Sequence, residues 1–139
     1  MNQKISDRTF DFAVKISKYQ VYLKEKKCYE IASQLFKSWT SVWANISEAQ
    51  SSVSKKDFIN KMNISLKEGR KTVFRLKLLE QWFEESNEEL QKECEEIIKI
   101  LIVVIKNTKN NLRKYIYKLF VFLNFTLYIL NSFKNGFIT

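Results

Sequence analysis

Four polar side chains follow one another at intervals of three, four and three residues: Ser38, Ser41, Asn45 and Glu48. On a helix this spacing places all four on one side. Hydroxyl, amide and carboxylate groups exchange hydrogen bonds, so the stripe could bind a polar ligand. More often such a stripe satisfies buried hydrogen bonds between helices or subunits, and we expect that structural role here.

A second set of side chains, further along, is basic. On a helical wheel five cations fall within a sector of about 120°, together with two amides: Lys56, Lys67, Arg70, Lys71, Lys77, Asn60 and Asn63. Each cation can neutralise a phosphate and release a counterion, which is what a surface that follows a nucleic-acid backbone requires. We expect this stripe to lack aromatic side chains for base stacking, and therefore to bind with little sequence specificity. A solvated helix face, or pairing with an acidic helix or partner, remains an alternative.

The charges are segregated along the chain, which carries a net +9 overall. Residues 55–77 hold eight basic and two acidic residues, and residues 80–96 hold eight glutamates and one lysine. From Lys99 to the end there are basic residues and no acidic ones. An acidic run on a helix is usually a solvated face, and here it also offers a complement to the basic stripe.

Several kinds of chemistry are disfavoured by the composition. There is no histidine, the commonest general base and metal ligand, and no glycine-rich nucleotide loop. Cys28 and Cys94 lack the spacing of a metal or redox motif, so we expect reduced structural thiols. The first residues are polar, with no signal-peptide core behind them. We therefore expect a cytoplasmic, non-enzymatic protein without a cofactor or metal.

The spacing of apolar residues predicts which segments are helices and therefore carry these side chains. The chain has no proline and two glycines, and four amphipathic segments span residues 6–26, 29–51, 55–83 and 87–110. Short connections predict an all-α, antiparallel up-down-up-down four-helix bundle within residues 1–111. Ser54 should cap the third helix, and Gly69 should mark a close approach of a neighbouring helix. The expected inward line of the first helix is Phe10, Ala13, Val14, Ser17 and Val21.

Three stretches of the chain resemble one bacterial family of four-helix bundle proteins. They are residues 33–50, apart from Trp39 and Trp43, then Ser54–Ile59 through Leu66–Glu68, and Cys94–Leu101. The family includes the 23S rRNA-intervening sequence proteins and the accessory variability determinant of diversity-generating retroelements. The resemblance implies a non-enzymatic homo-oligomer, with a ring-like pentamer as the first expectation, and a basic surface that contacts RNA or DNA, or a reverse transcriptase.

The tryptophans depart from the family pattern. Trp39 and Trp43 stand where the family usually has glycine, and Trp82 stands near a turn that often contains glycine. One hypothesis is a decoding difference, because UGA is read as tryptophan in some genetic codes and as glycine in others. If the indoles are genuine, overpacking predicts that they point outward or hold helices apart. The codons at these three positions decide between the two.

Residues 112–139 form a hydrophobic tail of different composition, rich in residues with A·T-only codons. Leu119–Phe133 is nearly all apolar but spans fifteen residues, short of the roughly 20 that a membrane-spanning helix needs. Three interpretations remain open: a membrane-associated or partner-packing helix, a spanning helix, or an accidental extension of the reading frame. A membrane is not the expected partner.

Overall, the sequence favours a homo-oligomeric bundle that binds nucleic acid or a nucleoprotein through the basic stripe. The alternatives are a protein-interaction scaffold without a nucleic-acid role, and membrane association through the tail. Pull-down after nuclease treatment separates the first two.

Overall fold

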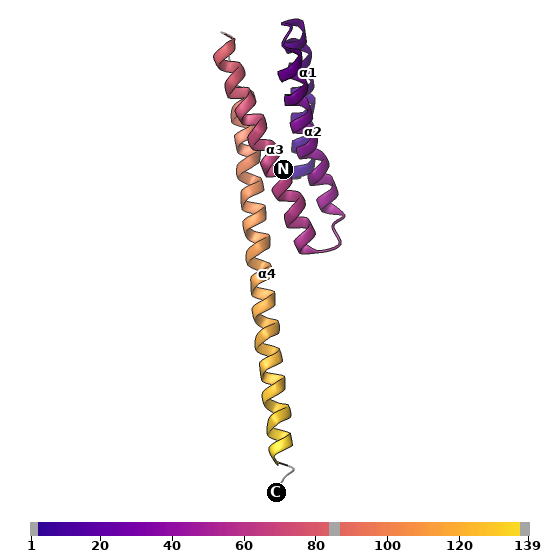
Figure 1. Cartoon of the computed structure of the whole chain (residues 1–139), viewed down its shortest axis with the longest axis vertical. Coiled ribbons are helices and arrows are strands. Elements are labelled where there is room, and N and C mark those ends of the chain that lie inside the picture. The colour runs from indigo at the N-terminus through magenta and orange to yellow at the C-terminus, as the bar shows by residue number, and fades with distance from the viewer. Residues whose placement is uncertain (1–2, 84–86, 137–139) are drawn as a thin grey trace. The chain divides into compact units, whose positions relative to one another are not determined.

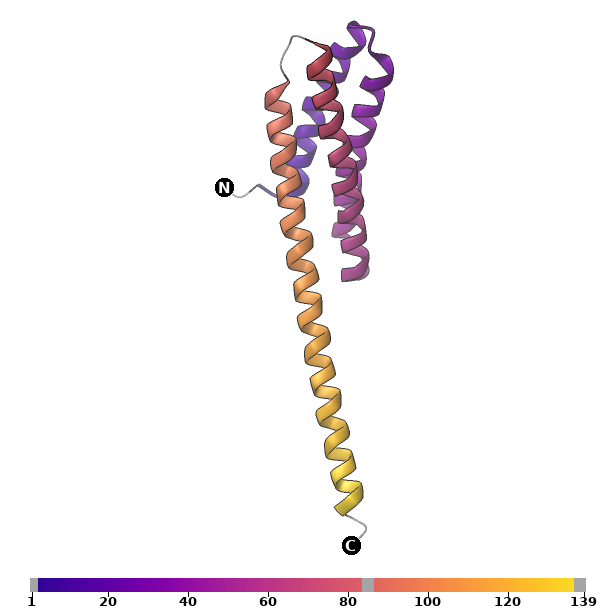
Figure 2. The same cartoon turned by 60° about the vertical axis from the view of Figure 1, so that its left-hand side comes forward.

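The computed structural model describes residues 3–83 and 87–136, and these residues form four helices (Figure 1). Their bounds are α1 Ile5–Glu25, α2 Tyr29–Gln50, α3 Lys55–Trp82 and α4 Glu88–Gly136. The chain divides into two compact units, Met1–Ile105 and Lys106–Thr139. The predicted all-α four-helix bundle is confirmed for the first unit, in which consecutive helices pack on one another (Figure 2).

The contacts between α1, α2 and α3 combine apolar packing with buried hydrogen bonds. Phe12 of α1 meets Trp39 of α2 edge to face, with ring centroids 4.3 Å apart. The hydroxyls of Ser38 on α2 and Thr72 on α3 lie 2.9 Å apart, and both residues are buried. Since buried polar groups are costly without partners, this hydroxyl pair helps to fix how α2 and α3 pack.

The first turns of α4 close the bundle against α3 and α1. A Cβ added to Gly69 would lie 3.2 Å from Cγ1 of Ile98, so the close approach predicted at this glycine is confirmed. Asn87 donates a hydrogen bond to the carbonyl of Leu76 at 2.9 Å. Glu93 of α4 pairs with Lys15 of α1 at 2.6 Å. Glycine at position 69 therefore lets two helices approach more closely than a larger residue would.

Local signals at the ends of the helices explain where they begin and stop. Ser54 accepts a hydrogen bond from the backbone N–H of Asp57 at 3.1 Å, as the predicted N-cap requires. After α1, Lys27 has a left-handed backbone with φ of 61°. Its N–H donates to the carbonyl of Lys24, and the N–H of Cys28 donates to that of Leu23, both at 2.9 Å. These are the two bonds of a Schellman cap, which turns the chain into α2.

The inward line predicted for α1 is wrong. Phe10, Val14 and Val21 are 51%, 42% and 57% exposed, and the buried residues are instead Thr9, Phe12, Ile16 and Leu23. The helix carries two apolar lines about 200° apart, at 100° per residue, so periodicity alone fits either face. Thr9 tolerates burial because its hydroxyl donates to carbonyls of the preceding turn. The line that contains Phe10, Val14 and Val21 therefore forms an exposed apolar surface on α1.

Of the two alternatives expected for genuine tryptophans, pointing outward does not hold for Trp39, which is fully buried against α1. Trp43 is 37% exposed and lies against Phe10, with ring centroids 5.8 Å apart. Trp82 is 60% exposed. Packing around Trp39 therefore accommodates the large indole rather than excluding it, which small neighbours such as Thr9 permit.

The fourth helix does not stop near residue 110 but continues to Gly136. Among the residues of α4 whose burial is described, the last buried one is Ile105, where the first compact unit also ends. The second unit is helical over Lys106–Gly136, and nearly all of its described side chains are exposed. The tail predicted after Asn111 thus continues a helix without an intervening break.

Candidate functional site

The basic stripe lies on α3, the longest helix contained wholly in the first unit. All five of its predicted cations are exposed: Lys56, Lys67, Arg70, Lys71 and Lys77. The opposite side of α3 is buried through residues that include Ile59, Met62 and Leu76. The amphipathic division of the helix therefore holds the cations at the surface.

Two of the five cations pair with glutamates. Lys71 contacts Glu68 on its own helix at 2.6 Å, and Lys77 contacts Glu95 of α4 at 2.9 Å. The alternative that the acidic helix neutralises the basic stripe therefore holds for Lys77. Lys56, Lys67 and Arg70 have no ion pair within the described parts of the chain. Exposed pairs are weak, so all five positions can still contribute positive potential.

Phe74 is a functional candidate that the sequence analysis missed, and the expectation that the stripe lacks aromatic side chains is wrong. Its ring is 66% exposed. It follows Lys67 by seven residues and Arg70 by four, which places it in the middle of the basic sector. A hollow of about 410 Å³ lies beside it, lined by Asn63, Leu66, Lys67, Arg70, Lys71 and Phe74. The helical spacing from Lys67 was the signal that could have revealed it.

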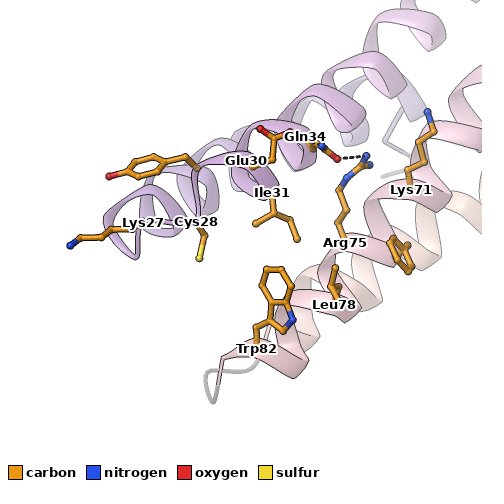
Figure 3. Close-up of a pocket in the computed structure, with 11 residues that line it drawn as sticks. Lys27, Cys28, Glu30, Ile31, Gln34, Lys71, Arg75, Leu78 and Trp82 are labelled. Atoms are coloured by element: carbon orange, nitrogen blue, oxygen red, sulfur yellow. Dashed lines mark hydrogen bonds between the residues drawn. The ribbon is translucent and has the colours of Figure 1, made fainter.

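A larger groove of about 660 Å³ lies between the start of α2 and the end of α3. Figure 3 shows Cys28 and Ile31 on the α2 side and Leu78 and Trp82 on the α3 side. Lys71 and Phe74 line both hollows, so the groove continues the basic surface. No motif in the sequence marks this groove, because its two sides come from different helices.

Arg75 lies in the same groove. One guanidinium nitrogen donates to Oε1 of Gln34 at 3.1 Å (Figure 3). The other terminal nitrogen, Nη1, is buried and has no hydrogen-bond partner among the described residues. Arg75 therefore brings a further positive charge to a largely apolar groove.

The polar stripe of α2 does not converge on a common site. Ser38 is buried against Thr72, with its hydroxyl also donating to the carbonyl of Leu35 at 2.9 Å. Asn45 donates to the carbonyl of Ser41 at 2.9 Å, within α2. Glu48 accepts a hydrogen bond from Lys61 of α3, and this bond raises the pKa of Lys61. The contacts of Ser38 and Glu48 therefore join α2 to α3, whereas that of Asn45 stays within α2.

The two cysteines differ in environment. Cys94 is buried with its Sγ 3.8 Å from the carbonyl oxygen of Gly69, and burial raises the pKa of its thiol. A buried protonated thiol is unreactive. Cys28 is half-buried at the groove. Across residues 3–83 and 87–136 no cluster of three or more His, Cys, Asp or Glu residues could hold a metal ion.

The sequence model of the 23S rRNA-intervening sequence protein family matches residues 1–103. The chain belongs to this family. The match ends within two residues of Ile105, so membership in the 23S rRNA-intervening sequence protein family covers the bundle and leaves the tail outside. A comparison with curated proteins gave no match.

A solved structure supports the same assignment. The chain is similar to a crystal structure of a protein of unknown function from the S23 ribosomal protein family, from Bacteroides thetaiotaomicron VPI-5482. The two share 37% identity with a TM-score of 0.71, over 74% of this chain and 99% of the other. The match therefore takes in nearly the whole of that relative's chain but only about three quarters of this one.

Proposed function

We propose that the bundle is a non-enzymatic protein that binds the nucleic-acid backbone through the exposed face of α3. The observation that carries the proposal is the row of Lys56, Lys67 and Arg70, exposed and without ion pairs among the described residues. From Lys56 to Lys77 the helix rises about 32 Å at 1.5 Å per residue. A row of this length can contact several successive phosphates. The net charge of +9 adds long-range attraction for a polyanion.

Phe74 extends the proposal to single-stranded nucleic acid. Cations that follow the backbone, combined with an aromatic ring on which a base stacks, are the two elements of single-strand binding surfaces. A duplex keeps its bases stacked on one another and offers this ring nothing to stack on. The 66% exposure of Phe74 between Arg70 and Lys77 therefore favours unpaired RNA or DNA.

The experiment measures the affinity of the full chain for a short fluorescent single-stranded RNA at low salt. Lys67→Glu combined with Arg70→Glu should weaken binding at least tenfold, by removing two phosphate contacts and adding repulsion. The control is Lys18→Glu with Lys24→Glu, which makes the same charge change at exposed positions of α1. If both double variants lost the same affinity, the loss would follow from net charge alone. That result would contradict a binding site on α3.

Phe74→Ala separates stacking from charge. It should weaken single-strand binding by about 1–3 kcal/mol, the usual contribution of one base–aromatic stack, and leave duplex binding nearly unchanged. If Phe74→Ala weakened binding to single-stranded and duplex nucleic acid equally, base stacking on Phe74 would be contradicted. The proposed contacts between cations and phosphates would not be affected.

We also infer that the bundle forms a homo-oligomer. Two apolar surfaces support this: one includes Phe10, Val14 and Trp43, and the other is the groove with Tyr29 and Trp82. Because they are different surfaces, contact between them is head-to-tail, and such contacts form a ring when the rotation between neighbouring copies closes. Phe10→Lys should then lower the mass of the full chain in sedimentation experiments, whereas Val53→Lys, at a 95% exposed turn residue, should not. A monomeric wild-type chain would contradict the inference.

A further inference from the structure

Within the second unit, the segment Leu119–Phe133 has exposed apolar side chains in most directions around the helix. Leu119–Leu123 are five consecutive apolar residues, more than one full turn of 3.6, and each is between 48% and 64% exposed. Further exposed apolar side chains continue the surface: Phe125, Leu127, Tyr128, Leu130 and Phe133. A helix that is apolar in most directions is suited to a surrounding apolar phase. By length and composition, α4 contains a segment able to cross a membrane.

A protein partner would leave a different pattern. Earlier in the same helix, where α4 belongs to the bundle, the buried residues form one line: Cys94, Ile97, Leu101 and Ile105. One packed helix covers one such stripe and leaves the other faces to water. Within Leu119–Phe133 the polar line that contains Asn124 and Asn131 is narrow, and apolar side chains occupy most of the other directions. The segment lacks the strongly charged face of a helix that lies flat on a membrane. Lipid is the occupant that covers so wide an apolar surface.

Two polar side chains within the apolar segment, Asn124 and Thr126, bond to carbonyls of their own helix. Nδ2 of Asn124 donates to the carbonyl of Phe120 at 2.8 Å, and Oγ1 of Thr126 donates to the carbonyl of Phe122 at 2.6 Å. Both bonds stay within one helix turn. Polar groups that are internally satisfied cost less to bury in hydrocarbon than groups that lose water without replacement.

Cations flank the apolar segment on both sides. Arg113, Lys114 and Lys118 precede it, and Lys134 follows it. The fifteen residues of Leu119–Phe133 rise about 22 Å, and snorkelling of Lys118 and Lys134 toward the headgroups extends the span that the helix accommodates. The larger cluster at the N-terminal end matches the anionic leaflet and the excess of Lys and Arg found on the cytoplasmic side.

We propose that Leu119–Phe133 inserts across a lipid bilayer, with the basic residues on its N-terminal side held at anionic headgroups. The family match ends at residue 103 and the similar crystal structure spans 74% of the chain, so this anchor is an addition to the family bundle. The proposal rests on the tail alone. It stands or falls independently of nucleic-acid binding by α3.

The experiment floats the full chain with vesicles of mixed phosphatidylcholine and phosphatidylglycerol, with washes in high salt and at alkaline pH. The wild-type chain should float and stay with the vesicles after both washes. Leu123→Lys with Leu127→Lys should lower the floated fraction about tenfold, because two charges then lie mid-span. The control places the same lysines at Val21 and Val53, exposed apolar positions of the bundle, and should float like the wild type.

Three results would overturn insertion. Release by salt or alkali would show adsorption at the surface, and an equal loss in the control would show a general charge effect. Sedimentation of the wild-type chain as lipid-free aggregates would identify the tail as a self-association element. Circular dichroism of each variant confirms that the bundle remains helical, so that lost flotation reports on the tail.

Discussion

The indole N–H of Trp39 donates a hydrogen bond to the backbone carbonyl of Thr9 at 2.9 Å. This bond joins α2 to α1 at a point where both residues are fully buried. It removes the usual penalty for burying an indole nitrogen, and the edge-to-face contact with Phe12 fills the space around the ring. At a position where the resemblance led us to expect glycine, the chain thus has an anchor of its core.

Trp39→Ala should destabilise the bundle by about 3–5 kcal/mol, as removal of a large buried aromatic generally does. Trp82→Ala, at a 60% exposed position, should change the free energy of unfolding by under about 0.5 kcal/mol. Urea denaturation followed by circular dichroism measures both. Unchanged stability in Trp39→Ala would contradict the anchoring role of Trp39 and would agree with a core built for a small residue, as the decoding hypothesis supposes.

Thr72→Val should cost about 1 kcal/mol, because it removes the partner of the buried Ser38 hydroxyl while keeping side-chain shape. Thr40→Val is the matched control, since its hydroxyl bonds only to carbonyls of α2. Thermal unfolding of the two variants compares a bond between helices with one inside a helix. Equal losses would mean that the polar stripe of α2 contributes little to how α2 and α3 pack.

Stability should fall at alkaline pH because of Cys94. Burial, followed by the charges of Glu95 and Glu93, raises the pKa of this thiol above its ordinary value of 9.0. Above that value the unfolded chain releases the thiol proton while the folded chain keeps it, so the free energy of unfolding falls as pH rises. One such group contributes up to about 1.4 kcal/mol per pH unit. Cys94→Ala should have the shallower decline between pH 9 and 10.5; parallel curves would contradict the assignment.

The sequence predicted the fold well where apolar residues form a single line. Leu35, Val42 and Ile46 of α2 lie on one apolar line and are all buried, and Gly69 lies close to Ile98 as predicted. The prediction failed for α1, since Phe10 and Phe12 belong to two lines of similar apolarity and only tertiary packing selects one. The continuous α4 was also missed, because the change of composition after Asn107 coincides with no helix-breaking residue.

Helical spacing predicts those parts of the candidate site that lie on a single helix. The five cations of α3 could be placed on one face from their positions alone, and Phe74 could have been added by the same geometry. The pairing of Lys77 with Glu95 and the groove between Ile31 and Trp82 depend on how two helices pack. Such features require coordinates, since residues far apart in sequence form them.

The central claim is that cations of α3 contact phosphates, and the salt dependence of binding tests it most directly. The affinity of the full chain for single-stranded RNA is measured over a range of salt concentrations, for the wild type and for Lys67→Gln with Arg70→Gln. We predict a steep loss of affinity with salt for the wild type, and a slope smaller by about 1.4 in the variant, because each single-strand phosphate contact contributes about 0.7. Identical slopes for the two proteins, or binding that does not change with salt, would contradict the account.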